Sequence, residues 1–117
     1  MAGGNRRSPL TGAAAFEAVF RNGRRREGDY VQLISMPAAQ DRGRTGFAIS
    51  RKALRLAVDR NRVRRMLRVL LREARPVTDA HDLIVRLKPG ARRADFPAIV
   101  AEAARLLGNL AAQRRTP

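Results

Sequence analysis

The sequence predicts an α+β fold in which helices pack on one small mixed sheet. Three short segments alternate apolar and polar residues as strands do, and longer segments repeat apolar residues at helical spacing. Residues 45–88 read as strand, helix and strand, which requires a crossover and lets the two strands lie parallel. The chain has 117 residues, 44% of them hydrophobic, and no internal repeat, so it fits a single compact domain.

We expect this domain to span residues 10–113. Residues 1–9 are rich in Gly, Arg and other polar residues, which predicts a flexible basic arm, and residues 114–117 predict a flexible tail. The first helix follows the arm, from an N-cap at Thr11 to about Arg21. The domain therefore begins with a short helix.

The strands are expected at residues 29–36, 45–50 and 81–88. A short polar loop joins the first two, so we expect them to pair as a hairpin. Because side chains alternate between the faces of a strand, each strand has a core face and an open face. The core face holds Val31, Leu33, Phe47 and Ile49. The open face, expected to be a shallow surface, holds Gln32, Ile34, Ala48 and Ser50.

The long helix expected from about Asp59 to Arg75 holds seven arginines and only two acids. At 100° per residue, its apolar residues fall on one arc that faces the core, namely Val63, Met66, Leu67, Leu70, Leu71 and Ala74. A second arc forms an arginine ridge of Arg60, Asn61, Arg64, Arg65, Arg68, Arg72 and Arg75. Like charges four residues apart repel on a helix, so the ridge favours an external anion over an ordinary solvated face. A last amphipathic helix is expected over residues 96–112.

The overall charge indicates the kind of partner. Lys and Arg number 25 against 10 Asp and Glu, which gives a net charge of +15 and a pI of about 12. Such an excess in a small domain predicts a polyanion, and we favour nucleic acid over an acidic protein or a membrane surface. The sequence has neither a signal peptide nor an apolar run of roughly 20 residues, so we expect a soluble intracellular protein.

Chemistry carried by the protein itself is poorly supported. The absence of cysteine excludes a disulfide, a thiolate nucleophile and a zinc–thiolate cluster. His81 is the one histidine, and the acids are scattered without metal-binding spacing. We therefore expect no catalytic residue and no metal site in the protein.

The segment SRKALRLAVDRNRVRRMLRVLLR (residues 50–72) closely resembles the protein subunit of bacterial ribonuclease P. The match consists of Ser-Arg-Lys at residues 50–52, then Ala57, then Arg-Asn-Arg-x-Arg-Arg-x-x-Arg over residues 60–68. Val69 follows, where the family often has Glu. Further segments that match in order are residues 16–23, 44–46 and 82–90.

This resemblance implies the order α-β-β-β-α-β-α, with a left-handed β-α-β crossover in a ribosomal-protein-like two-layer sandwich. A short fourth strand would come from residues 24–28. It also implies a ribonucleoprotein endoribonuclease in which a catalytic RNA, with its Mg²⁺ ions, removes the 5′ leader of precursor tRNA. The protein would be bacterial, cytoplasmic and monomeric on its own. The alternative, from a different class, is a ribosomal or ribosome-associated structural protein, also small, basic and cysteine-free.

The resemblance carries over two binding sites, residue by residue. The catalytic RNA would bind Arg60, Asn61, Arg62, Arg64, Arg65 and Arg68. The single-stranded leader would lie in a cleft between the first helix and the open sheet face, against Phe16, Phe20, Gln32, Ile34, Ala48, Ser50, Arg51 and Lys52. Phosphate contacts and base stacking tolerate many sequences, which suits a protein that accepts many leaders.

Overall fold

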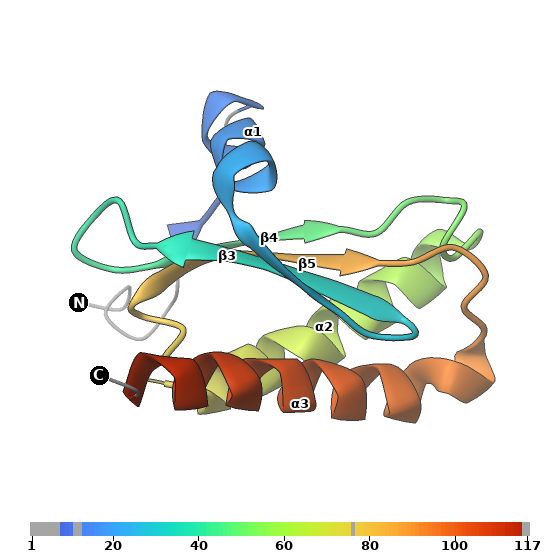
Figure 1. The fold of residues 1–117 in the computed structure, drawn as a ribbon. Helices are drawn as coiled ribbons and strands as arrows, with labels where there is room; N and C mark the ends of the chain where they lie inside the picture. Colours follow the sequence, from blue (N-terminus) through green and yellow to red (C-terminus); the bar gives the residue numbers. More distant parts are fainter. Residues whose placement is uncertain (1–7, 11–12, 76, 116–117) are drawn as a thin grey trace, which may run out of the picture.

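The computed structural model describes residues 8–10, 13–75 and 77–115, and it has the expected α+β architecture (Figure 1). Its helices are α1 (Ala13–Asn22), α2 (Ala57–Glu73) and α3 (Phe96–Arg115), with a short 3₁₀ turn, η2 (Arg93–Asp95), before α3. Its strands are β1 (Ser8–Pro9), β2 (Arg24–Glu27), β3 (Val31–Pro37), β4 (Arg44–Ala48) and β5 (His81–Leu87). The short strand expected at residues 24–28 is therefore present as β2. In the described ranges, no helix is long and apolar enough to cross a membrane.

Two secondary-structure elements reach into the terminal segments that the sequence predicts to be flexible. Thr11 and residues 1–7 lie outside the described residues. Residues 8–9, placed by the sequence in the flexible arm, form β1 and pair in parallel with residues 44–45 of β4. At the other end, α3 continues to Arg115, two residues into the expected tail.

The strand order is β1-β4-β5-β3-β2, so β5 lies between β3 and β4. The expected hairpin between β3 and β4 is wrong: β3 pairs antiparallel with β5 and forms its hairpin with β2. The physical reason is burial, because Asp82 to Val85 of β5 are buried on both faces and such a strand belongs at the centre of a sheet. The expected parallel pairing is confirmed, since β4 and β5 run parallel and α2 connects them.

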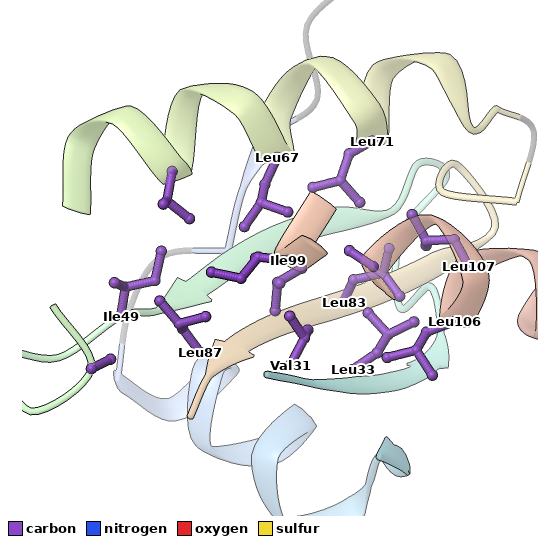
Figure 2. Close-up of a cluster of buried hydrophobic side chains, with 14 of the residues drawn as sticks. Val31, Leu33, Ile49, Leu67, Leu71, Leu83, Leu87, Ile99, Leu106 and Leu107 are labelled. Carbon is purple, nitrogen blue, oxygen red and sulfur yellow. The ribbon is translucent and has the colours of Figure 1, made fainter. Parts of the chain in front are cut away.

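The main core lies between one face of the sheet and helices α2 and α3, which both cover that face (Figure 1). Side chains from both helices, from β3 and β5 and from the residue that follows β4 meet there, among them Val31, Leu33, Ile49, Leu67, Leu71, Leu83, Leu87, Ile99, Leu106 and Leu107 (Figure 2). Burying one such aliphatic side chain contributes about 1.5–3 kcal/mol. Val31, Leu33 and Ile49 are buried as expected, whereas Phe47 is half-buried at the edge of the cluster.

A second, smaller core lies on the opposite face of the sheet, under α1 (Figure 1). It consists of Leu10, Val19, Ile34 and Ile84, and Ile34 and Ile84 are 0% exposed. The placement of Ile34 on an open, shallow surface was therefore wrong. α1 covers this part of the sheet because its own apolar stripe, centred on Val19, needs an apolar surface to pack against.

A buried carboxylate fixes the loop between β3 and β4. Asp82 is 1% exposed and accepts hydrogen bonds from the backbone N–H of Arg44 (2.9 Å) and of Ala39 (3.3 Å). It also forms an ion pair with the Arg44 guanidinium at 3.1 Å. Burial alone would raise the pKa of Asp82, but these donors outweigh it and lower the pKa below its ordinary value. Asp82 is thus a structural anchor of the fold.

Candidate nucleic-acid interface

The arginine side of α2 faces solvent because its apolar side is used by the core. Val63, Leu67 and Leu71 are buried at four-residue spacing, as the helical periodicity predicted. The polar residues on the other side are exposed at Asn61, Arg62, Arg65, Arg68 and Arg72. Arg60 and Arg64 are half-buried. α2 ends at Glu73, so Arg75 lies beyond the helix and instead pairs with Asp79 at 3.8 Å.

Three of the α2 arginines make contacts within the protein. Arg60 donates from Nη1 to the carbonyls of Leu54 (2.9 Å) and Arg55 (2.8 Å), which fixes the loop that leads into the helix. Arg64 donates to the side-chain oxygen of Asn61 at 2.8 Å. The Arg68 guanidinium lies 5.5 Å from the centroid of the Phe47 ring. These three guanidinium groups are therefore held in place before any ligand arrives.

The remaining exposed arginines of the helix are available to a ligand. In the described parts of the chain, no carboxylate forms an ion pair with any arginine from Arg60 to Arg72. Asp59, in the first turn of α2, pairs with Arg93 of η2 at 2.8 Å. Because no acid neutralises the middle of the helix, it carries a net positive surface that suits phosphate groups.

A second candidate surface lies on the α1 side of the sheet. The strand register places Ala48, Arg86, Gln32 and Glu27 side by side across β4, β5, β3 and β2, and we call these four residues the sheet row. The next row, from Gly46 to Arg25, contains Ile84 and Ile34 and lies under α1. The sheet row is therefore the part of this face beside the helix.

Polar contacts link the members of the sheet row. Gln32 donates to Glu27 and accepts from Arg86 at 3.3 Å, and it is only 6% exposed. Lys88 pairs with Glu27 at 2.6 Å. The hydrogen bonds from Lys88 and then Gln32 lower the pKa of the Glu27 carboxyl, which stays ionised. Gln32 thus mainly orients its two neighbours, and the accessible cation of the row is Arg86, which is half-buried.

Phe16 and Phe20 of α1 lie over the row next to the sheet row. Their ring centroids are 6.2 Å apart and both side chains are half-buried. A Cβ on Gly46 would lie 2.9 Å from the Phe16 ring, so glycine lets that ring approach the backbone of β4. At the other end, the Arg25 guanidinium of β2 stands 5.1 Å from the centroid of the Phe20 ring. The aromatic pair therefore extends across the sheet, from β4 toward β2.

Ser50, Arg51 and Lys52 follow β4 and are all exposed. The backbone carbonyl of Ser50 accepts from the N–H of Ala53 (3.1 Å) and the carbonyl of Lys52 accepts from that of Gly90 (3.4 Å). These bonds hold the segment at the β4 end of the sheet row, so its two cations border that row.

The structure brings together most of the residues expected at the leader site, but not all. Phe16, Phe20, Ala48 and the segment at residues 50–52 border one surface, whereas Ile34 and Gln32, which were also expected there, are both buried. The sequence-based prediction did not include Arg86 and Lys88. The alternation of side chains along β5 could have indicated them, because Arg86 and Lys88 lie on the same face of the strand as Ile84.

Comparison with known proteins gives the family. The family model described as Ribonuclease P matches residues 5–111. The chain is 38% identical over 104 residues to the Ribonuclease P protein component of Acidothermus cellulolyticus, with 86% of each chain covered. It is 34% identical over 97 residues to that of Microcystis aeruginosa, with 79% of this chain and 81% of the relative covered.

Solved structures share the fold. The RNase P protein from Thermotoga maritima matches with a TM-score of 0.68 at 22% identity, over 86% of this chain and 96% of that one. The RNase P protein of Staphylococcus aureus matches with a TM-score of 0.69 at 18% identity, over 94% and 97% of the two chains. With the fold, the family match and two relatives above 30% identity in agreement, this chain belongs to the ribonuclease P protein family and serves tRNA processing as a protein component of that ribonucleoprotein.

Proposed function

We propose that the protein binds the catalytic RNA of ribonuclease P through α2 and the 5′ leader of precursor tRNA through the α1 face of the sheet, while the RNA performs the cleavage. The observation that carries the proposal is the set of α2 arginines without an acidic partner in the described residues. Guanidinium groups bind phosphate oxygens in a bidentate manner, so a helix with several of them fits a folded RNA backbone. Arg62, Arg65 and Arg72 are the foremost contacts, and Arg60, Asn61, Arg64 and Arg68 frame them.

The leader lies along the sheet row, beside Phe16 and Phe20. Half-buried rings offer a face to an unpaired base, and such stacking contributes about 1–3 kcal/mol per base. Ala48 and Ser50 are small enough to let a backbone approach, and Arg51, Lys52 and Arg86 supply positive charge. These contacts do not select a base sequence, so many different leaders fit.

The chemistry belongs to the RNA in this proposal. In the described part of the chain, no group of three or more His, Asp or Glu side chains is arranged to hold a metal ion. We therefore assign the Mg²⁺ ions of the reaction mainly to the RNA, and phosphate binding and orientation to the protein. The protein acts as a monomer on its own and works in the bacterial cytoplasm.

A reconstitution experiment tests this proposal. Purified protein is mixed with a bacterial ribonuclease P RNA and end-labelled precursor tRNA, at a Mg²⁺ concentration too low for the RNA to act alone. We expect cleavage at the mature 5′ end only when both components are present. Absence of cleavage with RNAs of both major structural types, despite tight and salt-sensitive RNA binding, would contradict the proposal and favour a ribosome-associated role.

A further inference from the structure

The edge strand β2 carries three consecutive arginines that neither proposed binding site uses. Arg24 and Arg25 are exposed and Arg26 is half-buried. In the described residues, none of the three forms an ion pair with a carboxylate. Burial lowers the pKa of Arg26, and the charge of Arg24 adds to that effect.

The strand register connects this edge to the proposed leader site. Arg25 and Glu27 point to the same face of the sheet as Ile34 and Gln32, their partners on β3. Arg25 is held in place, because its Nη2 donates to the Phe20 carbonyl at 2.7 Å and its guanidinium stands over the Phe20 ring. One basic group of the β2 edge is thus fixed beside the aromatic pair.

Basic residues therefore stand near both ends of the sheet row. Arg51 and Lys52 follow β4 at one end, and Arg25 stands on β2 at the other, two residues from Glu27 and on the same face. Arg24 is paired with Ser35 and points to the opposite face of the sheet. Three strand spacings separate β4 from β2, roughly 14 Å. The one acid of the row, Glu27, is already paired with Lys88. A single strand of RNA that crosses the sheet would leave it over the β2 edge.

We propose that Arg25 forms the exit of the leader path, where it binds a phosphate of leader nucleotides that extend beyond the sheet. The inference rests on the proposed function and adds the direction of the path and its far end. Charged residues on edge strands also prevent sheets from pairing edge to edge. That role accounts for a charge on β2 but not for the fixed position of Arg25 on the leader side.

Leaders lengthened one nucleotide at a time test the proposal. The dissociation constant of each precursor tRNA is measured with the reconstituted holoenzyme carrying wild-type protein or Arg25→Gln. We expect Arg25→Gln to weaken binding of long leaders by roughly two- to fivefold, the range of a solvent-exposed ion pair. The logarithmic salt dependence should fall by about 0.7 per lost phosphate contact, and short leaders should bind as in the wild type.

The matched control is Arg24→Gln, which removes the neighbouring exposed charge of β2 that points to the other face of the sheet. It should leave the leader-length dependence unchanged, whereas Arg25→Lys should restore part of the lost affinity. The proposal would be overturned if Arg25→Gln weakened binding of short and long leaders equally, or if it bound long leaders as tightly as the wild type does. If the wild-type holoenzyme cleaves and gains affinity from a leader, the proposed function stands whichever result the variants give.

Discussion

Glu102 is the side chain that fixes the turn between β2 and β3. Its Oε1 accepts hydrogen bonds from the N–H groups of Tyr30 (2.7 Å) and Val31 (2.8 Å), and its Oε2 accepts from that of Asp29 (2.7 Å). A Cβ on Gly28 would overlap the carboxylate, so the glycine makes room for it. One residue of α3 thereby sets the start of β3 and the position of Gln32 in the sheet row.

Replacing Glu102 by Gln should destabilise the protein, and the loss should depend on pH. The side-chain amide nitrogen of the glutamine would face a backbone N–H donor. The loss of hydrogen bonds from the backbone to a charged acceptor costs about 1.5–3 kcal/mol. Burial raises the pKa of Glu102, but the three N–H groups outweigh it and hold the pKa below its ordinary value. This stabilisation is therefore present at pH values above the ordinary pKa of a glutamate and is lost as the pH falls through the lowered pKa.

Urea unfolding of wild type and Glu102→Gln from pH 7 to pH 3 measures this effect. The difference in unfolding free energy should be largest at pH 7 and shrink in acid. Glu17→Gln is the control, since that carboxylate is 70% exposed and its pair with Arg21 contributes little. A difference that stays constant across the pH range would show that the charge of Glu102 is not what holds the turn.

At the scale of elements, α2 combines a structural and a binding role in separate arginines. We expect Arg62→Ala/Arg65→Ala to leave the thermal unfolding midpoint unchanged or slightly higher, since the change relieves like-charge repulsion. RNA affinity should fall, with the logarithmic salt slope smaller by about 2. Arg60→Ala should instead lower the unfolding free energy by about 1–2 kcal/mol, because two carbonyls lose their donor. Loss of helical circular dichroism in the double variant would contradict an exposed binding role for its two arginines.

Some features of the fold could be predicted from the sequence, and others could not. The buried positions of α2 followed from periodicity alone, because one helix face must pack against the core. The partner of each strand did not, since alternation sets which way side chains point and not which strand lies alongside. For this reason Ile34 was predicted to lie on an open surface. In the structure it is paired with Ile84 and packs in one cluster with Val19, and knowledge of this strand pairing would have indicated a second core.

At the scale of the whole molecule, two sheet faces serve two purposes. α2 and α3 close one face into the main core (Figure 1). Arginines on the other side of α2 are exposed to solvent. α1 closes only part of the other face and leaves the sheet row beside it. The two proposed RNA-binding surfaces therefore lie on opposite sides of the sheet, so one protein can contact the catalytic RNA and the leader together.

The net charge of +15 predicts opposite effects of salt on stability and on binding. Like charges destabilise the compact state, and KCl screens them, so the thermal unfolding midpoint of the free protein should rise between low and physiological salt. RNA affinity should fall over the same range, with a log–log slope of roughly −4 to −5 if about five phosphates are neutralised. Differential scanning calorimetry and filter binding in matched buffers measure the two quantities. The Arg62→Ala/Arg65→Ala variant should show a smaller response in both. A midpoint that falls as salt rises would mean that ion pairs such as Arg44–Asp82, rather than self-repulsion, dominate the electrostatic stability of the fold.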